Sequence, residues 1–500
     1  MRNSGYLLGF DLGSSSIKAT LLDAETGKTV ASAQLPDEEM RIISKKREWA
    51  EQDPEIWWAY LCKASKKVLR KSGINPEAVL AIGISYQMHG LVLVDRNHQV
   101  LRPSIIWCDS RATEIGKRAF DELGEQVCLE RFLNSPGNFT ASKLKWVKEN
   151  EPKIYNGIHK MMLPGDYVSM KMSGEISTTH TGLSEGILWD YKENQLARTL
   201  LQYYEIDERL IPDALPSFAE HGKLTAKAAD ELGLKRGVPI TYKAGDQPNN
   251  AFSLNVLSSD AGAATAGTSG VIYGVSEKPV FDEKSRVNSF IHVNHTEQNP
   301  SYGVLLCING TGILYRWIKQ NLIRDETINY DKMNNLALNT PIGADGVIIL
   351  PFGNGSERIL EDKNPGARFI GLNFNRHETG HLLRAALEGI VFSMKYGFSI
   401  MKGISISPKI IRAGRANLFL SPLFREAFAN STGSVLELYD TDGSEGAARG
   451  AGLGAGIFSD EKEAFIGLNI IETIEPELQK TKLYTTAYQN WIEELNAIIA

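Results

Sequence analysis

The sequence predicts an α/β protein made of two similar domains. Its 500 residues are more than one hydrophobic core usually supports. A turn rich in glycine and hydroxyl residues joins two strand-like runs around Gly13, and again around Gly267, about half the chain later. Segments with helical spacing of apolar residues accompany these runs. We expect domains at residues 1–253 and 254–500, each offering one hairpin to a shared cleft.

Strand and turn patterns are clearest at the start of each half. Residues 6–10, 17–23 and 29–35 read as strands, and the polar residues 11–16 as the turn between the first two. In the second half, residues 261–266 and 271–275 read as strands on either side of the turn at 267–270.

Two long helices are indicated by capping residues and by periodicity. Asp53 and Pro54 suit a helix start, and the helix should run to about Leu69 with its lysines and arginine forming a solvated face. Apolar residues recur at helical spacing over 381–397. The small residues of 450–456 predict a closely packed helix start.

Composition excludes several classes of protein. A net charge of −6 argues against a nucleic-acid binder. No apolar run approaches the roughly 18 residues of a membrane span, and no secretory signal is present, so we expect a cytoplasmic protein without membrane contact. The four cysteines are scattered, which disfavours a disulfide scaffold or a zinc site.

The two glycine-rich turns are candidate phosphate sites. Backbone N–H groups in such turns can meet phosphate oxygens, and Asp11 at a strand end can hold a hydrated divalent cation. When each segment is taken alone, a plain β-hairpin is the favoured interpretation. The chain contains neither a Gly-x-x-x-x-Gly-Lys-Ser/Thr loop nor the His-Arg-Asp and Asp-Phe-Gly pair of protein kinases.

Two further strand ends carry polar groups. Asp246 follows a strand-like run and could accept a proton from an attacking hydroxyl, although an Asx-type turn is the alternative. Gln87 and His89 follow the run 79–84, where ligands gather in α/β folds. Nearby Trp107 and Arg111 suit either a pocket wall or a buried structural pair.

Taken together and in this order, the segments resemble the FGGY family of carbohydrate kinases over residues 6–460. The turns at 11–15 and 267–270 resemble the family's two phosphate hairpins. Residues 140–147 resemble its first signature, with Asn138 as a departure, and residues 369–388 resemble its second. The resemblance implies an actin/hexokinase-like (ribonuclease H-like) fold, with mixed sheets flanked by helices around a central cleft. It also implies ATP and Mg²⁺ as cofactors, with the sugar and the catalytic base in the domain at 1–253 and ATP bound mainly by the domain at 254–500.

The resemblance also implies site residues. Gln87, Met88 and His89 are similar to the xylulokinase pattern of the family, which implies phosphorylation of D-xylulose to D-xylulose 5-phosphate with Asp246 as the general base. Gln247 departs from that pattern. Further implied sugar contacts are Trp107, Asp109 and Gln247. Asp11 would hold magnesium through water. The implied ATP contacts are Gly13, Ser14, Ser15, Gly267, Thr268, Gly310, Gly414 and Asn417.

Other functions stay open at this point. A kinase of ribulose, glycerol or a deoxyketose fits the same motifs. A catalytically silent sugar- or nucleotide-binding regulator is an alternative from another class, but it needs neither Asp11 nor Asp246. An actin-like filament protein is a further alternative, but it would not need a pocket at Met88 and His89. The partners are a small sugar and ATP, and the sequence leaves a homodimer open.

Overall fold

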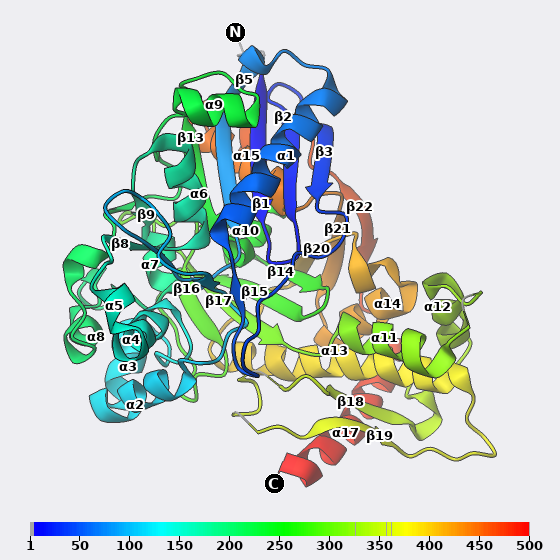
Figure 1. Cartoon of the computed structure of the whole chain (residues 1–500). Helices are drawn as coiled ribbons and strands as arrows, with labels where there is room; N and C mark the ends of the chain where they lie inside the picture. The colour runs from blue at the N-terminus through cyan, green and yellow to red at the C-terminus, as the bar shows by residue number, and fades with distance from the viewer. Residues whose placement is uncertain (1–4, 326, 357, 362, 500) are drawn as a thin grey trace. The chain divides into compact units, whose positions relative to one another are not determined.

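A computed structural model describes residues 5–325, 327–356, 358–361 and 363–499 (Figure 1). The chain forms two compact units. The first comprises Met1–Asn255, Phe290–Tyr302 and Thr441–Leu468, and the second comprises Val256–Ser289, Gly303–Asp440 and Asn469–Ala500. Two later segments therefore return to the first unit. The assignment of sugar binding to 1–253 and ATP binding to 254–500 stays a prediction.

A five-stranded mixed sheet forms the centre of the first unit, in the order β13-β5-β1-β2-β3. Strands β1 and β2 are antiparallel, as are β2 and β3, whereas β5 runs parallel to β1 and to β13. The first three strands fall where the sequence predicts them. The bounds are β1 (Tyr6–Leu12), β2 (Ile17–Asp23), β3 (Thr29–Leu35), β5 (Val79–Tyr86) and β13 (Ile240–Gly245).

A seven-stranded sheet forms the centre of the second unit, in the order β16-β17-β15-β14-β20-β21-β22. The five strands from β17 to β21 stand third, second, first, fourth and fifth in order along the chain. The first sheet shows the same order when it is read from β3 to β13. The repeat predicted from the two turns is therefore a repeat of topology. The bounds are β14 (Ala261–Ala266), β15 (Gly270–Ser276), β16 (Asn288–Ile291), β17 (Tyr302–Ile308), β20 (Ile410–Gly414), β21 (Val435–Tyr439) and β22 (Ile470–Ile474).

Helices and short strands surround these sheets. In the first unit the principal helices are α1 (Pro54–Ser72), α2 (Thr113–Leu123), α3 (Glu125–Phe132), α4 (Thr140–Asn150), α6 (Pro164–Ser173), α7 (His180–Glu185), α9 (Ala226–Leu232), α10 (Asp246–Ser253) and α15 (Gly443–Gly454). In the second unit they are α11 (Gly312–Ile318), α12 (Tyr330–Leu338), α13 (Thr379–Gly403), α14 (Pro422–Thr432) and α17 (Leu478–Ile499), with the hairpin of β18 (Ile348–Phe352) and β19 (Gly366–Ile370).

Helices α1 and α15 cover opposite faces of the first sheet. Alternate residues of a strand point to opposite faces. Leu8, Phe10 and Leu12 of β1 join the hydrophobic core that contains α1, whereas a methyl group built on Gly9 would lie 1.9 Å from the Ser444 carbonyl oxygen of α15. Glycine in β1 is thus what lets α15 approach the sheet.

Helix α1 agrees with its prediction, whereas the segment 450–456 does not. Helix α1 begins as expected, since the Asp53 side chain accepts a hydrogen bond from the Glu55 N–H, and most of its basic residues are exposed. The prediction of a helix start at 450–456 is wrong, because these residues lie at the end of α15. Their close packing is confirmed: a methyl group on Gly450 would lie 2.6 Å from the Tyr242 ring.

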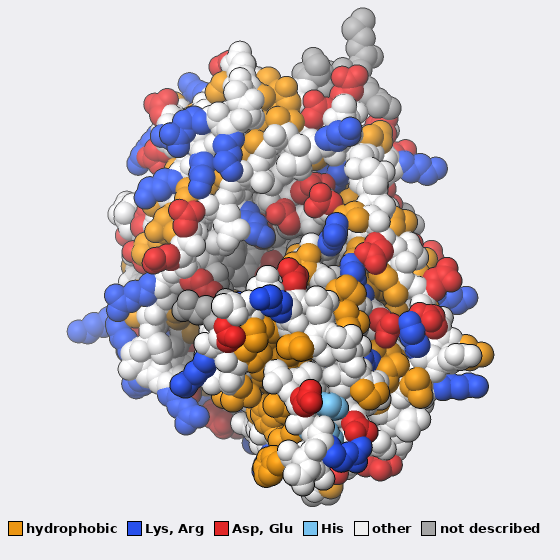
Figure 2. Space-filling view, turned by 90° about the vertical axis from the view of Figure 1, so that its right-hand side faces the viewer, with side chains coloured by type: hydrophobic (Ala, Val, Ile, Leu, Met, Phe, Trp, Pro, Cys, Tyr) orange, Lys and Arg blue, Asp and Glu red, His pale blue; other side chains and the backbone are white. Residues whose placement is uncertain are grey.

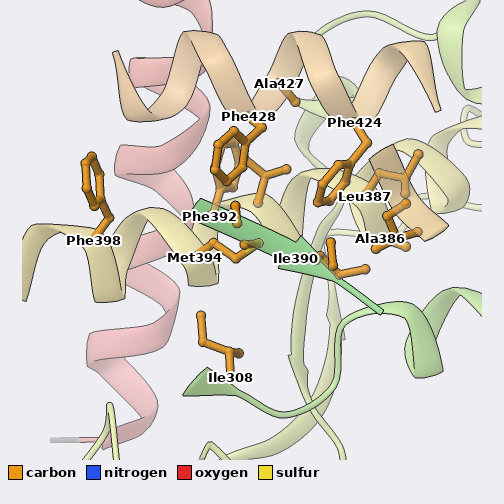
Figure 3. Packing of buried hydrophobic residues seen from close by; sticks show 14 of the residues in the cluster. Ile308, Ala386, Leu387, Ile390, Phe392, Met394, Phe398, Phe424, Ala427 and Phe428 are labelled. Atoms are coloured by element: carbon orange, nitrogen blue, oxygen red, sulfur yellow. The ribbon is translucent and has the colours of Figure 1, made fainter. Parts of the chain in front are cut away.

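The core of the second unit is built on α13, the longest helix. Figure 3 shows Ile390 and Met394 of α13 between Ile308 of β17 and the phenylalanines of α14, Phe424 and Phe428. The predicted helix over 381–397 is confirmed, and it extends to Gly403.

Exposed hydrophobic side chains gather on the second unit, over α11 and α12 in the lower half of Figure 2. They include Trp317, Tyr330, Leu336 and Leu338. Contact surfaces often have this character, and a homodimer stays a prediction. Among the described helices, none combines bilayer-spanning length with the hydropathy that a membrane span requires.

Candidate functional site

Asp246 lies where β13 ends and α10 begins. It is the first residue of the helix, so the Asx-type turn considered as an alternative is not what the structure contains. Its side chain is half-buried, and burial, with a smaller contribution from the charge of Asp11, raises the pKa of this carboxyl from 3.8 to about 7. A carboxyl with this pKa can both accept and release a proton near neutral pH.

Asp11 lies in β1, on the strand next to β5. Its Oδ1 accepts a hydrogen bond of 2.9 Å from the Ser85 hydroxyl, and its Oδ2 would lie 2.7 Å from a methyl group built on Gly443. Burial raises the pKa of the Asp11 carboxyl, Lys18 lowers it, and the charge of Asp442 raises it. Asp442, which the sequence did not suggest, therefore adds to the negative charge around Asp11.

The residues around Asp11 suit magnesium better than a protein-enclosed metal. Within the described ranges, no three His, Cys, Asp or Glu side chains are grouped as metal ligands. Magnesium usually keeps several waters and binds through one or two carboxylates and substrate phosphates. The carboxylate of Asp11, close to the charges of Asp246 and Asp442, fits that mode.

The first hairpin turn is held by one hydrogen bond within it and by two from residues outside it. Gly13 N–H donates to the Ser16 carbonyl oxygen at 3.1 Å, Gln52 Nε2 donates to the Ser14 carbonyl oxygen at 2.7 Å, and Trp107 Nε1 donates to Ser14 Oγ at 3.2 Å. The structure thus brings Trp107 to the hairpin, and the side chain of Trp107 remains 40% exposed.

Gln52 links this hairpin to the predicted sugar contacts. Besides its bond to Ser14, its Oε1 accepts hydrogen bonds from Trp57 Nε1 at 3.0 Å and from Gln87 Nε2 at 3.4 Å. Sequence reasoning missed Gln52, which precedes the helix-capping residue Asp53 and matches no motif.

Met88 and His89 follow the end of β5. Met88 is buried, and His89 is half-buried with a φ of 61°, in the left-handed region. The His89 ring contacts Phe139 edge-on, with ring centroids 4.7 Å apart, and Nδ1 lies 2.9 Å from the Glu185 carbonyl oxygen.

Lys143 of α4 holds the backbone of this loop. Its ammonium group donates to the His89 and Ile106 carbonyl oxygens, at 3.0 Å each. Because Lys143 is fully buried, its pKa falls from 10.5 to about 8, although the charge of Asp109 opposes the change. The segment that resembles the first family signature, residues 140–147, therefore belongs to the helix that holds the backbone at His89.

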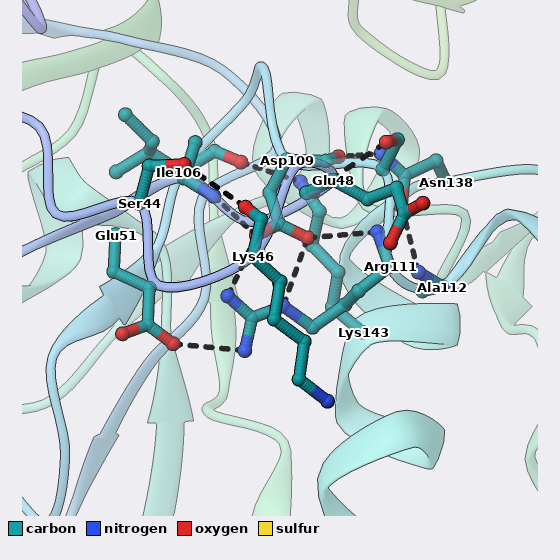
Figure 4. A network of polar contacts seen from close by, with 12 residues as sticks. Ser44, Lys46, Glu48, Glu51, Ile106, Asp109, Arg111, Ala112, Asn138 and Lys143 are labelled. Atoms are coloured by element: carbon teal, nitrogen blue, oxygen red, sulfur yellow. Dashed lines mark hydrogen bonds and ion pairs between the residues drawn. The ribbon is translucent and has the colours of Figure 1, made fainter.

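Asp109 belongs to a buried ionic network (Figure 4). Its carboxylate accepts the Ala50 N–H at 2.6 Å and pairs with Arg111, whose Nη2 lies 2.7 Å from Oδ2. The Arg111 guanidinium packs against the rings of Trp49 and Trp146, 4.0 and 4.8 Å from their centroids. Because protein groups already bind the Asp109 carboxylate, a structural role is favoured. A sugar contact by Asp109 stays a prediction.

The predicted nucleotide-binding residues of the second unit lie around the second hairpin turn. Thr311 Oγ1 donates to the carbonyl oxygens of Gly267 and Thr268 at 2.9 and 3.0 Å, which places Gly310 beside the turn. A methyl group on Gly267 would lie 3.5 Å from Asn417 Nδ2. Gly414 ends β20, which runs parallel to β14, so both strands end at the same edge of the sheet.

Comparison with known proteins agrees with this arrangement. The model of the N-terminal domain of the FGGY family of carbohydrate kinases matches residues 6–253, and that of its C-terminal domain matches residues 262–457. A curated relative, the xylulose kinase of Lactococcus lactis, is 27% identical over 97% of this chain and 95% of its own length.

Solved structures share the fold. The xylulose kinase from Rhodospirillum rubrum superimposes with a TM-score of 0.86 at 24% identity, covering 98% of each chain. A structure described as gluconate kinase from Lactobacillus acidophilus has a TM-score of 0.89 at 23% identity, covering 99% of this chain and 98% of that one. The expected two-domain actin/hexokinase-like fold is confirmed.

Proposed function

Since this chain belongs to the FGGY family of carbohydrate kinases and is thus a sugar phosphotransferase, we propose that it phosphorylates D-xylulose at the 5-hydroxyl with ATP, using Asp246 as the general base. The observation that supports the base assignment most is the position of Asp246 at the start of α10, half-buried and with a pKa of about 7. ATP use is implied by the family.

The choice of D-xylulose rests on the local motif and on the names of the relatives. Met88 and His89 follow the xylulokinase pattern, and curated relatives at 26–29% identity are named xylulose kinases. Gln247 departs from that pattern and lies beside the proposed base. A kinase of ribulose, glycerol or a deoxyketose is therefore the second candidate.

The chemistry proposed for Asp246 is proton acceptance during phosphoryl transfer. The 5-hydroxyl oxygen forms its bond to the γ-phosphorus while the bond to the ADP oxygen breaks, and the hydroxyl proton passes to the Asp246 carboxylate. General base catalysis of this kind typically contributes about 10²- to 10⁴-fold. Burial, and after it the negative charge of Asp11, raises the proton affinity of Asp246, which suits it to this transfer.

The other residues bind and orient. Backbone N–H groups of Ser14 and Ser15 in the first unit, and of Gly267 and Thr268 in the second, would donate to phosphate oxygens. Met88 and His89 would contact the ketose. Asp11 would hold Mg²⁺ through water, and the ion would supply neutralisation of the phosphate charge.

A panel of sugars tests the substrate. ADP formation is measured with ATP, Mg²⁺ and each of D-xylulose, ribulose, glycerol, gluconate and deoxyketoses. We expect the highest kcat/KM with D-xylulose. A higher kcat/KM with another acceptor would move the assignment to that sugar, and no ADP formation with any acceptor would refute the kinase reaction itself.

Asp246→Ala tests the base. The variant should still bind the sugar and ATP but lose nearly all turnover, whereas the control Asp230→Ala, an exposed position of α9, should keep it. A folded Asp246→Ala protein with a rate close to wild type would contradict the assignment.

A further inference from the structure

Glu185 is a buried carboxyl group at the end of α7 for which the mechanism above has no role. It is fully buried, and its side chain lies over Gly245. A methyl group built on Gly245 would be 2.3 Å from Glu185 Oε2 and 2.6 Å from Met88 Cγ. Because Gly245 immediately precedes Asp246, this carboxyl lies beside both the proposed base and a proposed sugar contact.

Although the Tyr86 hydroxyl and the His89 N–H lie near them, the two carboxyl oxygens of Glu185 lack a well-aligned protein partner among the described residues. Neither makes a hydrogen bond of good geometry with any residue in the described part of the chain. Lys243, a buried cation on the same strand as Gly245, is paired with Asp166 instead, at 2.9 Å.

Electrostatics makes this position still less favourable for a charge. Burial, followed by the charges of Asp246 and Asp166, raises the pKa of the Glu185 carboxyl well above its ordinary value. The Tyr86 hydroxyl and the His89 N–H oppose this effect only in part.

A buried, poorly partnered carboxyl destabilises a fold unless something else satisfies it. A glutamine would fill the same volume without the charge, and the glycine at 245 is what leaves room for the group. Such a carboxyl next to a proposed base is characteristic of a position that binds a ligand.

We propose that the Glu185 carboxyl binds a hydroxyl group of the sugar other than the one that Asp246 deprotonates, and so helps to select the sugar. This inference rests on the proposed function. A carboxyl group can accept a hydrogen bond from a hydroxyl, or donate one to it when protonated. When Asp246 carries its charge, a neutral polyhydroxy substrate is also favoured over a sugar acid.

The side chain can be tested separately from the backbone. The carbonyl oxygen of Glu185 contacts His89 Nδ1 at 2.9 Å, and Glu185→Gln keeps this contact and the side-chain shape. The control is Glu175→Gln, which changes an exposed carboxyl after α6.

The experiment compares wild type and Glu185→Gln on the preferred sugar and on each of its monodeoxy analogues. For wild type, removal of one hydroxyl should lower kcat/KM by about 10- to 100-fold, because it leaves the buried Glu185 carboxyl without its partner. Glu185→Gln, whose amide presents a different pattern of donors and acceptors, should lose part of that factor on the parent sugar but nothing further on that one analogue. The KM for ATP should not change, and Glu175→Gln should behave as wild type.

Several outcomes would overturn the proposal. A Glu185→Gln enzyme with wild-type kcat/KM on every sugar would do so while leaving the kinase function intact, and so would an equal loss on the parent and on all analogues, which indicates a structural role. Absence of sugar phosphorylation by wild type would instead refute the proposed function, and this inference with it. Glu185→Met serves as the second variant if Glu185→Gln does not fold, with the same expected pattern.

Discussion

Replacing Asp246 by asparagine should stabilise the protein, and the gain should grow with pH. Wild-type Asp246 has a pKa of about 7 in the folded state and an ordinary value of 3.8. Between these values the folded state binds the proton more tightly than the unfolded state, so the stability of wild type falls as pH rises. Since one pKa unit corresponds to about 1.4 kcal/mol, the full effect is at most about 4 kcal/mol.

The assay is urea unfolding of wild type and Asp246→Asn, followed by circular dichroism, from pH 4 to pH 8.5. The difference in unfolding free energy should be small near pH 4, increase up to about pH 7 and remain constant above it. Asp230→Asn, at an exposed carboxyl of α9, is the control and should differ from wild type by the same amount at every pH. A difference for Asp246→Asn that does not depend on pH would refute the reasoning, because it would mean that Asp246 titrates alike in both states.

Three further predictions follow from the same geometry. The kcat/KM of wild type should rise with pH and reach half its plateau near pH 7, where Asp246 loses its proton; a profile that is flat from pH 5.5 to 8.5 would contradict this. Gly245→Ala should cost about 1–3 kcal/mol of stability and most of the activity, since the new methyl would meet Glu185 and Met88, whereas Gly403→Ala has open space and should be neutral in thermal unfolding and in rate. Lys143→Met should cost about 1–3 kcal/mol in urea unfolding, because it removes the ammonium donor of the His89 and Ile106 carbonyl oxygens, of which the Ile106 oxygen keeps the Asp109 N–H, and should raise the KM for the sugar more than that for ATP; equal changes in both KM values would argue against a role in positioning His89.

Local features of the fold were predictable because their causes lie within a few residues. Strands β1, β2 and β3 alternate with turn residues that stop them, and Asp53 with Pro54 supplies both the cap and the first turn of α1. The internal repeat could be read from two similar turns, because a β-hairpin is a local structure whose sequence signature survives on its own.

The placement of Asp246 at a strand end was also predictable. Its pKa was not, since that depends on burial and on Asp11, which lies far away in the sequence. In the same way, Asp109 matched a motif for sugar binding, but its partners Ala50 and Arg111 could be known only once the chain had folded around them.

The sequence by itself determined the two-unit α/β organisation, the two hairpins and the strand-end carboxylates, because each depends on short-range patterns of polarity, glycine and caps. Only the tertiary structure decided which groups meet at Asp246. Gln52 and Glu185 belong to no motif, and they reach Ser14 and Gly245 through packing between segments distant in the chain. The reason is physical: hydrogen bonding and desolvation act over a few ångströms in space, whatever the separation along the sequence.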